Sequence, residues 1–162
     1  MNRSEKLAAR IEQGAAELAA FAEGLSDAEW RTPVNNGGKD RRPIGVLVHH
    51  VASMYPIEVD IARAVAGGQA VTDVTWAAVA DINAKHAADN GNTTKAAALE
   101  LLRRNSHDAA EVIRSFSDED LDRAAPFSLS YGAPVTTQFV VEDHALRHAW
   151  HHLAAMRATL GK

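Results

Sequence analysis

The chain has 162 residues, of which 46% are hydrophobic and 23% charged, and its formal net charge is -4. These values are typical of one globular domain that can bury its own core, and they exclude a disordered chain. The excess of 21 acidic over 17 basic residues argues against nucleic-acid binding, and zero Cys excludes disulfides, thiolate metal ligands and a cysteine nucleophile.

The N-terminal segment has no apolar stretch of the kind that signal peptides contain, and no later run approaches the roughly 18 apolar residues of a membrane span. We therefore expect a cytoplasmic protein without membrane contact, folded as a single domain over residues 1–162. Residues 4–25 repeat apolar side chains at steps of three and four, which predicts a helix with one buried face. Ser26 and Glu29 then have the spacing of a capping box, before an Asn- and Gly-rich loop at residues 32–42.

A second long helix is predicted to begin near Pro43 and to stop at Gly67. Pro56 lies midway along it, and its missing N–H leaves a carbonyl one turn back unpaired, which predicts a kink. Residues 74–88 predict a shorter helix, and the break at residues 90–92 leads to a third long helix, capped by Thr93 or Thr94 and running to residue 116.

Ser117 and Asp120 repeat the capping-box spacing, and a segment punctuated by Pro and Gly leads to a last helix over residues 136–160. The alternation of Phe127, Leu129 and Tyr131 could form a short extended piece, the one such pattern in the sequence. Four long helices with a long middle connection predict an all-α four-helix bundle, with an additional short helix in the crossover. Sites in such bundles are built from side chains on facing helices.

Two groups of His residues are therefore candidate site residues. His49 and His50 are adjacent, so their side chains point about 100° apart on a helix. His50 shares the apolar arc of the second helix, whereas His49 shares its side with charged residues. A lone inward His is usually a hydrogen-bonded core residue, but the last helix carries a second group.

His144, His148 and His152 form a ladder at four-residue spacing, on a helix face without charged residues. Residues i and i+4 lie about one turn apart, roughly 5.4 Å, which lets two imidazoles share one ion. A ladder pair must include His148, with either His144 or His152 as its partner. Burying three imidazoles merely to fill the core would cost free energy, because their polar nitrogens would leave water. The pattern therefore favours a metal site. Ala145 and Ala149 stand where a zincin protease has its glutamate, which argues against peptidase chemistry.

Two segments, VHHVA at residues 48–52 and HAWHHLAAMRATLG at residues 148–161, resemble the two signatures of the DinB/YfiT-like superfamily. The resemblance covers nearly the whole chain in order and spacing. It implies an up-down-down-up bundle in which His50, His148 and His152 bind zinc or nickel. The chain departs from many relatives at Leu153-Ala154, where those have Gly-Gln, and at Lys39, where they often have Trp.

Three neutral ligands would leave a divalent ion an open coordination position, which is typical of a catalytic site. Members of this superfamily are S-transferases that use bacillithiol, mycothiol or glutathione, so the resemblance implies transfer or isomerisation with a low-molecular-weight thiol as cofactor. Hydrolysis by metal-bound hydroxide is a second hypothesis, and a noncatalytic metal-binding or stress protein is a third. A cavity at the open metal position would indicate an enzyme acting on a small-molecule substrate, whereas a plugged site would indicate a scaffold.

The remaining expectations concern residues outside the two His groups. Tyr55, Glu58 and Glu142 are the polar residues on the two His-bearing helices considered as candidates to assist hydrolysis. The helical wheel places none of them beside the ligands, so no general base is assigned. We expect His86 and His107 at the surface. We expect the three Trp side chains, Trp30, Trp76 and Trp150, to act as packing anchors. The family resemblance and the Ala-rich helix faces also suggest a homodimer.

Overall fold

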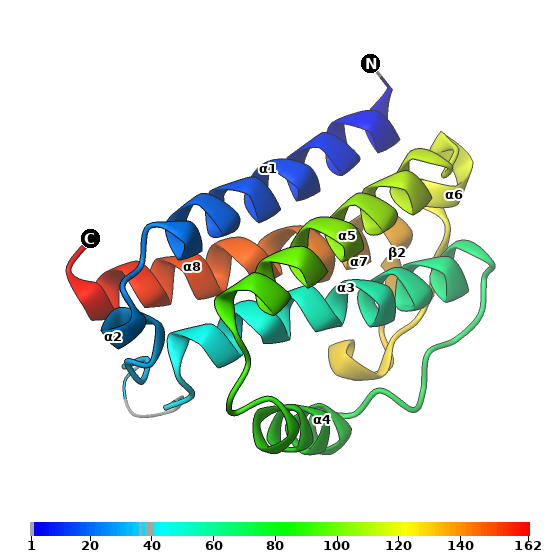
Figure 1. The fold of residues 1–162 in the computed structure, drawn as a ribbon. Coiled ribbons are helices and arrows are strands. Elements are labelled where there is room, and N and C mark those ends of the chain that lie inside the picture. Colours follow the sequence, from blue (N-terminus) through cyan, green and yellow to red (C-terminus); the bar gives the residue numbers. More distant parts are fainter. Residues whose placement is uncertain (1, 36, 38–40) are drawn as a thin grey trace.

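The structure is a computed structural model that describes every residue except 1, 36 and 38–40, and it is mostly helical (Figure 1). Lys39, one of the departures noted above, lies outside the described residues. The long elements are α1 (Arg3–Glu23), α3 (Ile44–Ala66), α5 (Lys95–Arg114), and a last segment formed by α7 (Thr137–Val141), a π-helical turn (Glu142–Leu146) and α8 (Arg147–Leu160). The short elements are α2 (Asp27–Trp30), α4 (Trp76–Asp89), α6 (Asp118–Asp122), β1 (Ala124–Pro126), a 3-10 turn (Ser128–Ser130) and β2 (Pro134–Thr136).

The four long segments form the predicted bundle with up-down-down-up directions. In Figure 1, α1 and α8 run one way, and α3 and α5 run the opposite way. Around the bundle, α1 packs on α5, α5 on α3, α3 on α7 and α8, and α8 again on α1. The long connection between α3 and α5 carries α4, which lies outside the four-helix core beside α3.

The core follows the apolar periodicity of the sequence, because the residues that recur at three- and four-residue steps are the ones that become buried. Trp30 is a packing anchor as predicted, and it donates from Nε1 to the carbonyl of Thr93 at 3.2 Å. Its ring lies against Gly45 so closely that a Cβ added there would overlap it. The first turns of α3 therefore depend on a glycine at this one position.

The carbonyl that Pro56 leaves without its usual donor is satisfied from another helix. Helix α3 continues through Pro56, and the side-chain amide of Asn105 on α5 donates to the Ala52 carbonyl at 2.9 Å. Because a buried carbonyl without a partner is destabilising, this bond lets α3 keep a proline at its centre. It also fixes the contact between α3 and α5 in register.

Local signals in the connections are confirmed, with one correction. Both capping boxes form, with Ser26 and Glu29 at α2 and Ser117 and Asp120 at α6. The extended piece expected at residues 127–131 is wrong, since that stretch turns through the 3-10 helix. The extended residues flank it instead, as β1 and β2 pair antiparallel with Ala125 opposite Val135.

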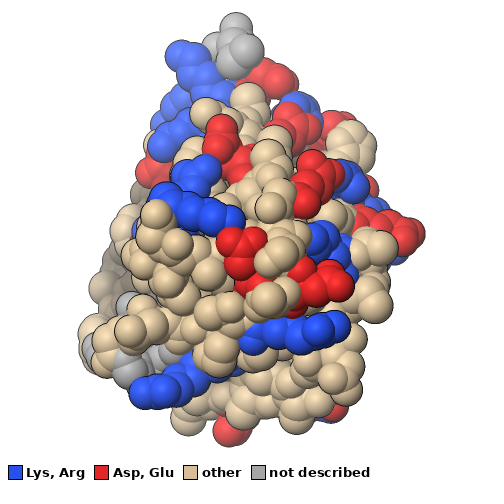
Figure 2. All heavy atoms as spheres, turned by 60° about the vertical axis from the view of Figure 1, so that its left-hand side comes forward, with Lys and Arg blue, Asp and Glu red and all other residues tan. Residues whose placement is uncertain are grey.

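No helix of the described residues is both long and apolar enough to cross a membrane. On the face drawn in Figure 2, acidic and basic side chains lie interspersed, as the nearly balanced composition leads one to expect.

Candidate metal centre

The first of the three predicted ligands, His50, comes from the middle of the bundle. It lies on α3 in a run of buried residues, and its own side chain is buried as the helical wheel predicts. Burial is the main cause that lowers its pKa to about 2, with further contributions from His148 and Arg42. The ring is therefore neutral, which is the state in which imidazole binds metals.

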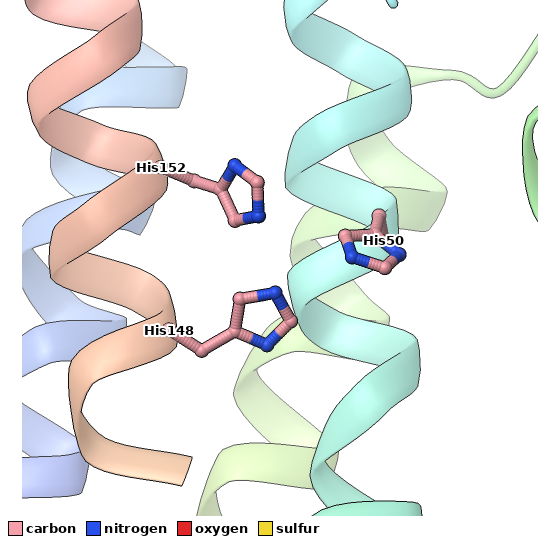
Figure 3. A group of neighbouring side chains, drawn as sticks. All are labelled: His50, His148 and His152. Atoms are coloured by element: carbon pink, nitrogen blue, oxygen red, sulfur yellow. The ribbon is translucent and has the colours of Figure 1, made fainter. Parts of the chain in front are cut away.

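The other two predicted ligands face His50 from α8. His148 and His152 project from successive turns of that helix toward α3 (Figure 3). One ring nitrogen of each of the three residues lies within 4.8 Å of the other two. Ligand nitrogens about 2.0–2.1 Å from one tetrahedral ion lie roughly 3.4 Å apart, so the three rings would have to move closer together to share an ion.

The chemistry of the donor set fits a divalent metal ion. Three imidazoles form the one such group of His, Asp and Glu found among the described residues. In addition, His50 Nδ1 is buried without a hydrogen-bond partner in the part of the chain that the structure describes. A buried polar atom without a partner is costly, and metal coordination would remove that cost. The cluster could therefore bind a metal ion.

Glu58 supports the cluster from α3, which the sequence analysis did not predict. Its Oε1 lies 2.7 Å from Nδ1 of His148, and the Glu58 side chain is 9% exposed. A carboxylate in this position accepts the Nδ1 proton, so the Nε2 of His148 keeps a free lone pair. Ligating histidines in metal sites are commonly oriented in this way.

The structure also distinguishes the two ladder residues that helical spacing left open. His152 joins His50 and His148, whereas the ring of His144 lies against Phe127 with ring centroids 5.4 Å apart. His144 belongs to the π-helical turn, where the backbone is wider than an α-helix. On the two sides of this turn, the side chains contact different partners: His144 lies against Phe127, whereas His148 and His152 lie with His50.

The expectation for His86 was wrong, although His107 is exposed as predicted. His86 is buried at 9% exposure, where α4 packs on α3. Its Nε2 lies 2.8 Å from Nδ1 of His49, and its ring centroid lies 5.3 Å from that of His50. His49 is not part of the three-histidine cluster, as predicted, and its contact with His86 joins α4 to α3.

The three-histidine cluster opens onto a cavity of about 450 Å³ between α3, α4 and α8. Glu58 and Arg42 line it near the histidines, and Leu129 of the 3-10 turn lines another part of it. Trp76 also lines it and is 63% exposed, so the expectation that Trp76 is a packing anchor was wrong. The site is therefore not plugged by side chains, which is the arrangement expected of an enzyme.

The helical wheel of a single helix does not predict the roles of Glu58 and His86, because each residue meets its partner only where two helices pack together. Glu58 lies eight residues after His50, about 80° around the same helix, and it meets His148 only because α8 packs on that side. His86 was read as a lone His on a polar helix. The one available signal is its spacing of seven and four residues from Val79 and Ile82, which places these side chains near one face of α4.

Comparisons with known proteins agree with this fold. A family model described as the DinB superfamily matches residues 10–156. The structure of YfiT from Bacillus subtilis, described as a probable metal-dependent hydrolase with an unusual four-helix bundle topology, is similar with a TM-score of 0.76 and 16% identity, over 99% of this chain and 90% of that one. No curated protein sequence matches this chain significantly.

A second similar structure is a mycothiol-dependent maleylpyruvate isomerase, with a TM-score of 0.69 and 14% identity. The match covers 96% of this chain and 61% of the isomerase, so this chain spans less than two thirds of that protein. At these identities, the similarity of both structures concerns the fold.

Proposed function

This chain belongs to the DinB superfamily, and on that premise we propose that His50, His148 and His152 hold one zinc or nickel ion in an enzyme that uses a low-molecular-weight thiol. The reaction is transfer of the thiol sulfur to a small electrophile, or isomerisation by reversible thiol addition. The observation that carries the proposal is the cavity at the three-histidine cluster. A noncatalytic scaffold has no need of a cavity beside an ion that has three protein ligands and one open coordination position.

The thiol has to come from a cofactor, because the chain contains no Cys. A divalent ion held by neutral ligands supplies one thing when it is bound, a lower pKa for a thiol that reaches it. In transfer, the sulfur forms a bond to carbon as the leaving group departs with its electron pair. In isomerisation, the sulfur adds to a double bond, the resulting single bond rotates, and the sulfur leaves again. The isomerase similar in fold is described as mycothiol-dependent, which supports this class of cofactor.

The chain's own residues would position these groups. Glu58 holds His148 in one tautomer and one orientation. Burial keeps the His50 ring neutral and away from bulk water.

Hydrolysis of a small molecule is the second candidate. It is supported by the fold similarity to YfiT, which is described as a probable metal-dependent hydrolase. The same open cavity would admit water in place of a thiol. The two candidates share the metal site and differ in the nucleophile, so one experiment separates them.

Metal content tests the site. Purified protein is expected to hold close to one zinc or nickel ion per chain by elemental analysis. His148→Ala should lose that ion, whereas His107→Ala, at an exposed position on α5, should keep it. A His148→Ala protein that retains the full metal content would contradict the three-histidine site.

A panel of thiols tests the reaction. The metal-loaded protein is incubated with 1-chloro-2,4-dinitrobenzene, an aryl electrophile, and with glutathione, mycothiol, bacillithiol or cysteine, and the loss of free thiol is followed. Acceleration with one thiol above the others is expected, and it should be lost in His148→Ala. Equal background rates with all four thiols, together with hydrolysis of an ester substrate, would favour the second candidate.

A further inference from the structure

The cavity at the three-histidine cluster has two chemically different sides. On one side, the π-helical turn and α8 contribute histidines and charged residues. On the other, α3 and α4 contribute most of the apolar residues, and His50 and Glu58 of α3 lie beside His148. On α3, the positions after His50 that line the cavity include Met54, Ile57 and Ile61, at steps of four, three and four residues. One stripe of the helix therefore carries the predicted ligand and the apolar side.

Most of the exposed large hydrophobic side chains lie on the apolar side of this cavity. Five large hydrophobic residues of the described chain are exposed, and three of them line this cavity: Ile57 at 40%, Trp76 at 63% and Ile82 at 40%. Exposed apolar surface gathered in one concave site is typical of a ligand-binding site. Helix α4 supplies two of the three and has one buried residue, His86. The large apolar side chains of α4 therefore line the cavity and are not buried in the bundle core.

The charged residues of the cavity largely offset one another. Arg147 forms an ion pair with Asp143 at 3.0 Å, and both lie on the histidine side. The remaining charged residues are Arg42, Asp73 and Glu58, which together carry a net charge of only -1. A ligand with several charges would therefore find little net attraction away from the ion, whereas an apolar group could remove water from the side formed by α3 and α4.

We propose that the substrate of this site carries an uncharged apolar group, aryl or alkyl, which packs on Ile57, Trp76 and Ile82 while its reactive end lies at the three-histidine cluster. The proposal rests on the function proposed above for the reactive end. The dimensions fit such a molecule. At about 1.5 Å per residue along α3, the apolar stripe extends from roughly 6 Å to 16 Å beyond His50.

The first test uses hydroxamates, which bind zinc through their head group. The affinity of the zinc-loaded protein is measured by calorimetry for acetohydroxamate and for its butyryl, hexanoyl and octanoyl homologues. Each added methylene that packs on the apolar side should raise the affinity by up to about fourfold. In the Ile57→Asn/Ile82→Asn double variant this rise should be lost, while the affinity for acetohydroxamate stays unchanged. Both positions are 40% exposed, so the double variant is expected to fold.

Phe139→Asn is the matched control. Phe139 is 45% exposed on α7 and is not among the cavity-lining residues. It should leave the rise with chain length intact. Equal affinities along the series, or a rise that survives in the double variant, would overturn the proposal. Failure of acetohydroxamate itself to bind zinc-loaded protein would contradict the open metal position, and hence the proposed function.

A second test needs no metal, so it stands even if the proposed function fails. N-phenyl-1-naphthylamine is uncharged and fluoresces in apolar surroundings. The metal-free protein should bind it, with affinity at least about tenfold lower in the double variant and unchanged in Phe139→Asn. Equal binding by all three proteins would overturn the apolar site.

Discussion

The bundle core and the side formed by α4 use the same kind of amphipathic helix for opposite purposes. In α5 the apolar stripe is buried against α1 and α3, with Leu102 at 0% exposure. In α4 the apolar stripe faces a cavity, and Ile82 is 40% exposed. Stability is therefore concentrated in the core, while α4 contributes a surface beside the three-histidine cluster. Each of the following substitutions tests one part of that division.

The largest difference is expected between two apolar truncations. Leu102→Ala should lower the free energy of unfolding by about 2–5 kcal/mol, because it leaves a void in a closed core. Ile82→Ala should lower it by less than about 1 kcal/mol, because the side chain is already partly solvated. Urea denaturation of both variants measures the two values, and equal losses would contradict the division between core and α4.

The bond between Asn105 and the Ala52 carbonyl should be the next largest contribution. Asn105→Ala leaves that carbonyl without a donor and should cost about 1–3 kcal/mol of unfolding free energy. In a Pro56→Ala background the loss should shrink, because the new N–H at residue 56 can supply the missing donor. A double-mutant cycle measures the coupling, and strictly additive effects would show that Asn105 does not act through this carbonyl.

Glu58 lies between the bundle core and the side formed by α4, and its substitution should change the affinity for metal. Glu58→Gln is expected to weaken zinc binding about 10- to 100-fold, because a neutral amide makes His148 a less basic ligand. Competition with a chelator measures the affinity. Glu142→Gln, on the same helical segment as His148 but with a more exposed carboxylate, is the control and should bind zinc normally.

The smallest effect is expected where α4 meets α3. His86→Ala removes the 2.8 Å contact with His49 and should speed amide exchange over residues 76–89 by up to about tenfold. Global unfolding should change by less than about 1 kcal/mol, as in the control His107→Ala. Unchanged exchange in α4 would show that the two imidazoles do not hold this helix in place.

The sequence predicts the bundle well, because amphipathic periodicity and capping are local properties. The wheel selects His50 over His49 from one helix, and spacing alone makes His148 part of any ladder pair. The selection of His152 rested on family resemblance, and the structure places it with the other two. Metal binding itself, the single domain and the homodimer stay predictions.

What the sequence did not predict depends on how separate elements dock. Glu58 and His86 reach the site only through packing of α8 and α4 on α3, and periodicity within one helix does not contain that information. The exposed position of Trp76 follows from the same docking. A long connection such as the one that carries α4 can place its helix on more than one face, which local signals do not distinguish.

The π-helical turn has a consequence for how the last helix can vary. Buried positions there recur every four residues, at Val141, Ala145, Ala149 and Leu153, although a regular α-helix drifts about 40° at each such step. The wider turn at residues 142–146 absorbs part of that drift. The turn acts as a one-residue insertion within the helix. The side chains of α8 are therefore rotated about the helix axis relative to those of α7. Residues that close the core at one end of the segment can therefore change without turning His148 and His152 away from His50.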